Sequence, residues 1–348
     1  QDVTDAASYL EWAGVSLGRE ETHCLHLSMK VLSAATGARE MRLWGKIHGL
    51  DADYIIAEGK VDPPEDEEEG AKDALGHTVE PTGQGANTFT YWVCRFAGDE
   101  WVRLPIVTPH QVMVARQIRR YMTGRLDAVV GGHPPFPGTE AGYLRAVIAL
   151  ISAETVIAPE GHYQRVEDEE SREIEVVPPD AYEGGEKDLT DPSNWVHTQL
   201  GLNVIGRTEP DPREDEDAEP PEDEPEKTEP LKPLSEDAAE GEEDVPWAFR
   251  PAPVSGIPTQ ESSYTVVKSL RWPGAVAVGL GRRFANFYVG YGQSATSGPY
   301  QPVLPGPIAA EFSVAAFNPA AEGATFEEQP DVTEDPNAGK PAEGEGDE

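Results

Sequence analysis

The chain has 348 residues and a formal net charge of −37, with 64 Asp and Glu against 27 Lys and Arg. This excess of acid argues against binding to nucleic acid or to anionic membrane surfaces, which both require clusters of Lys and Arg. No apolar run approaches the length of a membrane-spanning helix.

Most of the acidity lies in three stretches that contain few large apolar residues. Residues 65–69 carry −5, residues 209–244 carry −15 and residues 327–348 carry −8, together −28 of the −37. Such stretches cannot bury enough apolar surface to offset the entropy of ordering them. We therefore expect six regions: N-terminal helices and a β-hairpin (1–61), an acidic flexible insert (62–87), a central α+β region (88–208), an acidic disordered linker (209–244), a C-terminal β-meander region (245–321) and an acidic tail (322–348).

The first region predicts two helices followed by a hairpin. Residues 2–13 form a short helical pattern that Gly14 ends, and residues 19–35 form a second helix that Gly37 ends. Within the second helix, Leu25, Met29 and Leu32 recur at helical spacing and predict a buried stripe. Residues 41–47 and 54–61 alternate in polarity and predict two strands of one hairpin.

The central region predicts a strand pair and two helices. Residues 88–96 and 101–104 alternate, and Thr108, Pro109 and Gln111 form the start pattern of a capped helix. We expect this helix to continue to Gly124. Thr139 is expected to cap a second helix over 140–153, which is apolar around most of its circumference and therefore predicted to be buried; its charged residues are Glu140 and Arg145.

The remaining ordered segments predict strands. Short strands are expected at 155–158, 163–166 and 174–177, and residues 195–205 regain apolar character. Residues 265–272, 275–281 and 284–292 predict an antiparallel meander in which Phe287 and Tyr288 face opposite ways. The Pro-rich stretch Pro302–Pro307 is suited to extended docking on a partner. The fold class is thus α+β, with helices packed on antiparallel or mixed sheets and with long acidic disordered inserts and a tail.

Two motifs invite a chemical interpretation, and both are better explained structurally. His23, Cys24 and His26 could suggest a metal site, but on a helix these positions point in different directions and no second cluster completes the ligand set. Gly279-Leu280-Gly281 resembles part of a dinucleotide fingerprint. Phe284, however, occupies the third glycine position, and the following residues predict a strand, so a hairpin turn is favoured.

The sequence offers no catalytic residues, no cofactor-binding residues and no metal ligands, so we expect a protein that is not an enzyme and carries no cofactor. Cys24 and Cys94 are expected to be reduced, buried thiols. An unrecognised enzyme would instead require a concave pocket holding titratable groups with shifted pKa values.

One basic cluster stands out in this acidic chain: Arg116, Arg119, Arg120 and Arg125. Two interpretations remain open. The cluster is either a solvated helix face or a docking face for an acidic partner, including the acidic insert of the chain itself.

Several long motifs resemble the radial spoke head protein 4/6 family of motile cilia and flagella. The central ones are WVRLPIVTPHQVMVARQIRRYMTGRLDA and PPFPGTEAGYLRAVIALISA, and the C-terminal ones are LRWPGAVAVGLGRRFANFYVGYG and YQPVLPGPIAAEF. YLEWAGVSLGREE and RLWGKIHGLDADYIIAE near the start are similar to the same family, and so are NWVHTQLGLNVIGRT, PLSEDA and PWAFR. The motifs occur in the order of the family, with acidic inserts between them.

This resemblance implies a non-enzymatic structural subunit of the radial spoke head, located in the axoneme of a cilium or flagellum. It implies assembly with other radial spoke head subunits, as a homodimer or a heterodimer with a close paralogue. It also implies transient contact with central-pair projections, and transmission of mechanical signals between the central pair and the dynein arms. The alternative left open by the residues is an acidic chaperone or binding protein for basic partners, whose binding would be abolished by salt.

Overall fold

The fold is described from a computed structural model of the chain. The described residues are 3–14, 17–65, 67, 70–167, 174–179, 188–212, 228–238, 244–253, 263–281, 283–296, 298–302 and 308. All of these except Ile308 belong to one compact unit, Gln1–Val303. The tail 322–348 and most of the stretch Pro302–Pro307 lie outside the described residues.

An eight-stranded mixed sheet forms the centre of this unit, in the order β4-β3-β2-β1-β12-β11-β10-β9. Its first half is an antiparallel meander of β1 (Arg39–Ile47), β2 (Tyr54–Lys60), β3 (Thr90–Cys94) and β4 (Val102–Arg103). Its second half is another meander of β9 (Trp247–Pro253), β10 (Ser263–Ser269), β11 (Ala275–Leu280) and β12 (Arg283–Gly290). The two meanders join through β1 and β12, which are parallel. The N-terminal hairpin and the C-terminal meander expected from sequence are therefore parts of one sheet.

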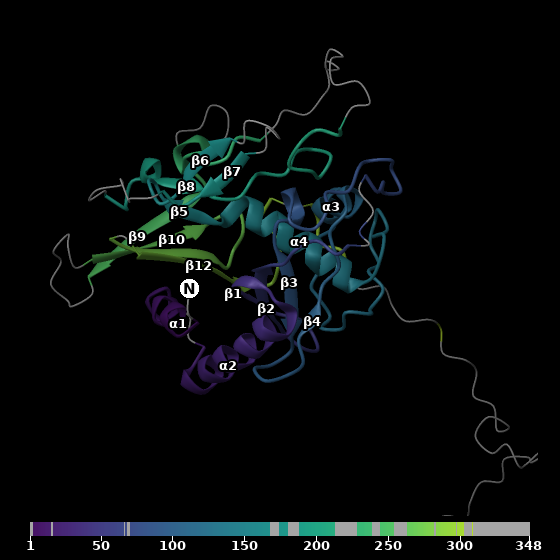
Figure 1. Ribbon diagram of the computed structural model, residues 1–348, viewed down its shortest axis with the longest axis horizontal. Helices are drawn as coiled ribbons and strands as arrows, with labels where there is room; N and C mark the ends of the chain where they lie inside the picture. Colours follow the sequence, from purple (N-terminus) through teal and green to yellow (C-terminus); the bar gives the residue numbers. More distant parts are fainter. Residues whose placement is uncertain are drawn as a thin grey trace, which may run out of the picture. The chain divides into compact units, whose positions relative to one another are not determined.

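Helices cover both faces of the sheet (Figure 1). The N-terminal helices α1 (Val3–Trp12) and α2 (Arg19–Thr36) lie on one face, and α3 (Pro109–Gln117) and α4 (Glu140–Thr155) lie on the other. Two small antiparallel sheets pair β5 (Ile157–Pro159) with β8 (Trp195–His197) and β6 (Gln164–Glu167) with β7 (Ile174–Val177). Single turns of 3₁₀ helix occur at η1 (Gly85–Asn87), η2 (Pro192–Asn194) and η3 (Leu234–Asp237). The predicted α+β class is confirmed.

Strand β2 contributes side chains to two apolar cores, one on each face of the large sheet. Tyr54 and Ile56 pack into the main core with α3 and α4, whereas Ile55 and Ala57 pack with α2. The strand is buried from Tyr54 to Gly59, because both of its faces are covered. Side chains on such a strand alternate between the two faces, which explains why adjacent apolar residues are all buried.

Helix α4 is the central element of the main core, as its apolar circumference predicts. Every residue from Gly142 to Ala153 is buried, including the charged Arg145, and so is Glu140 at the start of the helix. Thr139 precedes the helix as expected, but its side chain makes no capping hydrogen bond. At α2 the prediction is confirmed: Leu25, Met29 and Leu32 are buried, and Gly37 ends the helix in a left-handed conformation with φ 69°.

Helix α3 is shorter than its periodicity predicts. It begins at the expected capping box, in which Thr108 accepts from the backbone N–H of Gln111, but it ends at Gln117 and not near Gly124. Beyond it the chain is extended, and its carbonyl groups accept hydrogen bonds from other segments: Arg119 from the N–H of Gln301, and Met122 from the N–H of Leu50. Tertiary pairing therefore overrides the local helical pattern.

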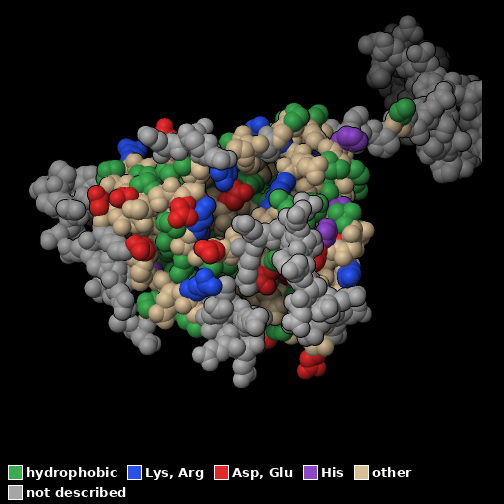
Figure 2. Space-filling model, turned by 90° about the horizontal axis from the view of Figure 1, so that it is seen from above, with side chains coloured by type: hydrophobic (Ala, Val, Ile, Leu, Met, Phe, Trp, Pro, Cys, Tyr) green, Lys and Arg blue, Asp and Glu red, His purple; other side chains and the backbone are tan. Residues whose placement is uncertain are grey.

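Two stretches assigned by composition to acidic connections contain packed residues. Within 62–87, the side chains of Val79, Glu80, Thr82 and Asn87 are buried. Within 209–244, Leu234 is buried against β8 and β9. Acidic residues on the described surface are interspersed with basic ones on the face shown in Figure 2. Composition alone thus misplaces the limits of the packed chain, because a few anchoring residues suffice to order a polar segment.

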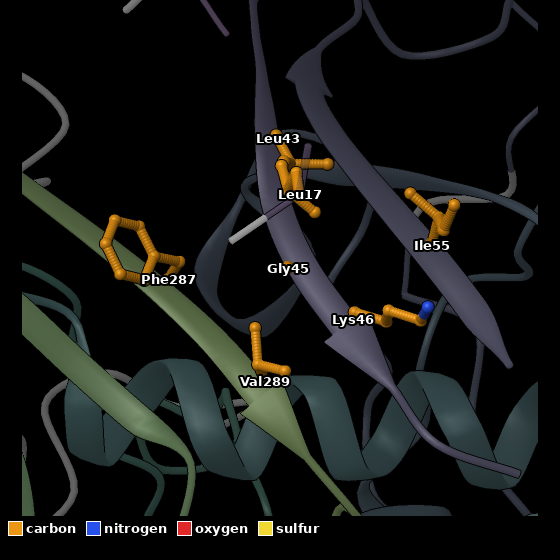
Figure 3. Close-up of a pocket in the computed structure, with 7 residues that line it drawn as sticks. All are labelled: Leu17, Leu43, Gly45, Lys46, Ile55, Phe287 and Val289. Carbon is orange, nitrogen blue, oxygen red and sulfur yellow. The ribbon is translucent and has the colours of Figure 1, made fainter. Parts of the chain in front are cut away.

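A narrow apolar crevice marks the middle of the sheet on the α1–α2 face. Leu17, which connects the two helices, lies over β1 beside Leu43, and Gly45 of β1 and Phe287 and Val289 of β12 line the same crevice (Figure 3). Its volume of about 10 Å³ leaves no room for a ligand. The crevice shows how one connecting residue covers the seam between the two meanders.

Candidate functional site

The arginines that the sequence groups together lie in different environments. Arg116 is partly buried and donates from its guanidinium group to the carbonyl oxygens of Asn203 at 2.6 Å and Leu202 at 2.9 Å. Arg120 is only 2% exposed and donates to the carbonyl oxygen of Gly131. Both residues therefore fasten loops of the chain itself. The hypothesis of a solvated helix face is wrong for both.

The other two arginines of the cluster, Arg119 and Arg125, also lie in different environments. Arg125 is exposed and lies 3.6 Å from Asp51, whereas the Nε atom of Arg119 is buried without a hydrogen-bond partner. Because α3 ends at Gln117, Arg119 and Arg120 follow an extended backbone and do not share a helix face with Arg116. A docking face built from all four arginines is therefore excluded.

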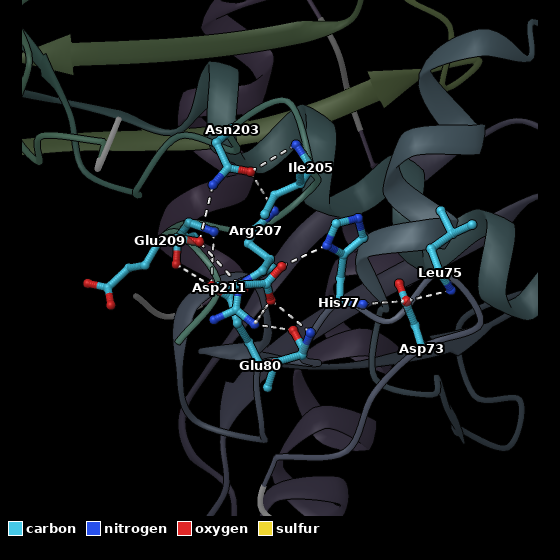
Figure 4. Close-up of polar contacts among 12 residues, drawn as sticks. Asp73, Leu75, His77, Glu80, Asn203, Ile205, Arg207, Glu209 and Asp211 are labelled. Carbon is cyan, nitrogen blue, oxygen red and sulfur yellow. Dashed lines mark hydrogen bonds and ion pairs between the residues drawn. The ribbon is translucent and has the colours of Figure 1, made fainter. Parts of the chain in front are cut away.

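Segment 71–87 is tied to the segment after β8 by a polar network (Figure 4). Asp211 lies 2.7 Å from the ring of His77 and accepts from the N–H of Thr78 at 2.8 Å. Arg207 reaches the same carboxylate at 3.4 Å. Burial opposes the charge of Asp211, but the hydrogen bonds from His77 and Thr78 and the charge of Arg207 outweigh it, so its pKa is lowered.

The buried carboxylate of Glu80 extends this connection. It accepts from the N–H of Thr208 at 2.9 Å and from the N–H of Ala86 at 2.8 Å. Asp73 accepts from the N–H of His77 at 3.0 Å and from the N–H of His110 at 2.8 Å, which joins the segment to the start of α3. The acids of this insert thus act as acceptors for backbone N–H groups, and this fixes the segment.

A second polar cluster fastens η3 to β8 and β9. Asp237 lies 2.8 Å from Nε2 of His197 and accepts from the indole N–H of Trp247 at 2.9 Å. Burial opposes its charge, but His197, Trp247 and Lys232 together lower its pKa. This stretch of the chain, residues 228–238, is held in place although composition assigns it to the acidic linker.

Charged groups are also buried between the sheet and α4. Glu58 is fully buried and pairs with Arg42, while the guanidinium group of Arg145 lies 4.6 Å from the ring centre of Tyr91. Burial opposes the charge of Arg42, but Glu58 outweighs it and raises its pKa. Burial lowers the pKa of Arg145, which donates to Ala86 at 2.6 Å. These groups connect β1, β2, β3 and α4.

The remaining sequence candidates do not form sites. His23 and Cys24 are exposed on α2, so Cys24 is not the buried thiol expected, whereas Cys94 is buried and burial raises its pKa to about 12. Among the described residues, no group of three or more His, Cys, Asp or Glu side chains is placed to hold a metal ion. Gly281 lies in the turn between β11 and β12, which makes the glycine pair part of a hairpin.

One pocket of about 210 Å³ lies between α3, α4 and the segment after β12. We name it the Trp272 pocket; its apolar wall includes Ile118, Tyr143, Val147, Leu150 and Trp272, and its polar wall includes Arg116, Arg119, Glu154, Gln293, Ser294 and Thr296. The basic cluster is the one indirect signal of this pocket in the sequence. No local pattern brings residues 115–154 together with 272–296, because the pairing depends on the sheet order.

No helix in the described part of the chain combines the length and the apolar character that crossing a membrane requires. What these clusters can do chemically is to hold distant segments in fixed positions. Four carboxylates each accept from a donor of another segment: Asp73, Glu80, Asp211 and Asp237.

Comparison with known proteins finds a matching family model and several relatives. The family model described as "Radial spokehead-like protein" matches residues 1–78 and 75–333. Radial spoke head protein 4 homolog A and Radial spoke head protein 6 homolog A, both of Homo sapiens, are each 34% identical over 89% of this chain, and the alignments cover 50% and 51% of these relatives. Flagellar radial spoke protein 4 of Chlamydomonas reinhardtii is 36% identical over 90% of this chain and 70% of its own length. The chain thus spans about half the length of the human relatives.

Proposed function

The chain belongs to the radial spokehead-like protein family, and we propose that it is a structural subunit of the radial spoke head in the axoneme of a cilium or flagellum. The observation that carries the proposal is the family match, which extends from residue 1 to residue 333 and includes both meanders and the helices between them. The relatives are named as radial spoke proteins, one of them flagellar.

The architecture supports a mechanical role. A sheet covered on both faces resists bending better than one with an open face, because its core is packed from two sides at near-crystalline density. Buried ion pairs and carboxylates connect segments far apart in sequence, such as Glu80 with Thr208. Such a body is suited to transmit a push or pull from the central pair toward the dynein arms without deforming.

We further propose that this subunit is not an enzyme, that it binds other radial spoke head subunits, and that it pairs with a second copy or a close paralogue. Its contact with central-pair projections is transient. The acidic tracts favour transient contact, since at cellular salt the Debye length is about 8 Å and such charges act only near contact. Neither nucleic acid nor membrane is a partner in this scheme.

Isolation from axonemes tests the proposal. Axonemes from cells that express a tagged chain are extracted, and the complex is resolved by size-exclusion chromatography and mass spectrometry at 0.1 M and 0.5 M salt. We expect stoichiometric co-elution with radial spoke head subunits at both salt concentrations. Recovery of the chain with basic proteins, in a complex that 0.5 M salt dissociates, would contradict the proposal and favour a chaperone for basic partners.

A further inference from the structure

We propose that the Trp272 pocket is the docking site for a segment of a neighbouring protein that presents a carboxylate beside an aromatic or aliphatic side chain. The inference deepens the proposed function: it rests on that function only in taking the neighbour to be a subunit of the same assembly. The binding chemistry of the pocket is argued from this chain alone.

The pocket has the size and lining of a side-chain acceptor. Its volume of about 210 Å³ can take one aromatic or branched aliphatic side chain, and Val147, Leu150 and Trp272 provide apolar contact. Tyr143 and Ile118 complete this wall. Burying such a side chain contributes roughly as much as burying a core residue, so the pocket can act as an anchor point.

Two nitrogen atoms on the polar wall lack hydrogen bonds. Nε of Arg119 and Nε2 of Gln293 are both buried, and neither has a partner. Buried donors of this kind are rare in folded proteins and usually mark a missing acceptor. Both residues line the pocket and both side chains as a whole are partly exposed, so an acceptor that enters the pocket lies beside them.

The charges on the wall favour a carboxylate as that acceptor. Arg116 donates to carbonyl oxygens and its charge interacts with that of Glu154, whereas no ion pair within 4 Å involves Arg119 among the described residues. The carboxylate of Glu154 is already engaged: it accepts from the indole N–H of Trp272 at 2.9 Å and lies 3.6 Å from Arg271. In a chain of net charge −37 this leaves a local excess of positive charge, which is complementary to an acidic group.

Tyrosine rings beside the pocket indicate a protein partner. The ring of Tyr121 lies 5.4 Å from both Tyr291 and Tyr300, and His48 lies 5.2 Å from Tyr291. Tyr291 is 56% exposed and immediately precedes the pocket residues Gly292 and Gln293. Tyr and Arg are enriched at the energetic centres of protein interfaces, whereas a small metabolite would not require this adjoining aromatic surface.

Peptide titration of the full chain tests the site. The probes are two ten-residue peptides with Gly-Ser flanks, one with Glu-Phe at its centre and the other with Gln-Phe. Binding is followed by the NMR signal of the Trp272 indole N–H, assigned with a Trp272→Phe variant. We expect the Glu-Phe peptide to shift this signal and to bind at least about tenfold more tightly than the Gln-Phe peptide, because charge-assisted hydrogen bonds are about twice as strong as neutral ones.

Variants locate the binding. Arg119→Leu and Gln293→Ala should each weaken binding of the Glu-Phe peptide several-fold, and Thr296→Trp should block the peptide from the rim while leaving Arg119 and Gln293 in place. Arg95→Leu, an exposed arginine paired with Asp99, is the matched control and should change nothing. Equal affinity for the two peptides, no shift with either, or a shift that persists in the Arg119→Leu, Gln293→Ala double variant would each overturn the proposal.

The same double variant separates this inference from the proposed function. If it enters axonemes normally and wild-type protein does not bind the Glu-Phe peptide, the docking site is wrong and the proposed function stands. If wild-type protein binds the peptide but never co-purifies with spoke head subunits, the proposed function fails and the binding chemistry stands. If the wild-type chain self-associates and the double variant does not, the occupant of the pocket is a second copy of this chain. That result would contradict the proposal that the occupant is a different neighbouring protein.

Discussion

Gly45 of β1 lies opposite Tyr288 of β12 in the parallel ladder that joins the two meanders. A Cβ atom on residue 45 would lie 2.0 Å from the carbonyl oxygen of Tyr288, and the φ of 152° at Gly45 is itself one that side chains disfavour. Backbone atoms cannot move aside as a flexible side chain can. The junction between the N-terminal and C-terminal halves of the sheet therefore depends on a residue without a side chain.

Gly45→Ala is expected to lower the free energy of unfolding by about 3 kcal/mol or more, since overpacking against fixed backbone forces the strands apart. Chemical denaturation of the full chain measures the change. Gly298→Ala is the matched control, because the nearest heavy atom to its added Cβ would be 4.0 Å away. Equal stability of the two variants would show that the β1–β12 pairing tolerates the methyl group.

Glu140→Gln is expected to destabilise the fold by about 2–4 kcal/mol. The carboxylate accepts from the N–H groups of Thr123 and Gly124 and from the hydroxyl of Tyr54 at 2.8–2.9 Å, at the N-terminus of α4. An amide removes the charge that the helix end favours and turns one acceptor into a donor facing donors. Glu20→Gln, in the exposed first turn of α2, is the control and should cost a few tenths of a kcal/mol.

Arg120→Met and Arg125→Met form a matched pair. Arg120 is buried and its loss removes the donor to Gly131, so we expect about 2–4 kcal/mol of destabilisation. Arg125 is exposed and its ion pair with Asp51 at 3.6 Å is screened by water, so its loss should be small. Thermal unfolding distinguishes the two outcomes. Similar melting temperatures for both variants would restore the idea of a common surface cluster.

Much of the fold follows from local patterns in the sequence. The periodicity of 140–153 and the alternation of 284–292 predict α4 and β12, because burial on one side of an element leaves a repeating mark. The parallel pairing of Lys46 with Val289 leaves none, since neither strand encodes its partner. The sequence does not predict that α3 ends at Gln117 for the same reason, because the hydrogen bonds that replace the helix come from the distant residues Leu50 and Gln301.

The candidate site was less predictable than the fold. The basic cluster pointed to the right part of the sequence, but only the tertiary structure shows that Arg120 is buried and holds a loop, and that Arg119 and Gln293 line the same pocket. Arg145 carried a clearer signal, since a lone charge within an apolar helix must be paired or hydrogen-bonded when the helix is buried. Its acceptor, the carbonyl oxygen of Ala86, lies in the segment that composition assigns to the flexible insert.

Asp237 should make stability depend on acid pH. Its pKa in the folded protein is lowered, so its contribution is present above the unfolded value near 3.9 and is lost as the pH falls through the folded value. We expect Asp237→Asn to be less stable than wild type by about 1–3 kcal/mol at pH 7, with the difference shrinking below about pH 4. Denaturation midpoints between pH 7 and pH 3 measure it. Asp62→Asn, at an 84% exposed carboxylate, is the control; a difference for Asp237→Asn that stays constant with pH would contradict the assignment.

We expect the acidic linker to tolerate shortening without loss of stability only between the residues that hold its two ends to the fold. Thr228 donates to the carbonyl oxygens of Gly201 and Thr208 at 3.0 and 3.3 Å, so the two ends of the intervening stretch lie close together. Replacing residues 213–227 with a short Gly-Ser linker is therefore expected to leave the melting temperature within about 2 °C of wild type, since loop length contributes only logarithmically.

Deleting all of 209–244 is a different experiment. It removes Leu234, which is fully buried, and Asp237, which holds His197 and Trp247, so we expect a loss of about 3–5 kcal/mol and impaired assembly. A motility defect in such a deletion would report lost packing and not lost charge. The role of the acidic tract in softening contact with the central pair is therefore tested by the 213–227 replacement: unchanged motility and unchanged central-pair affinity at low and high salt would rule it out for that stretch.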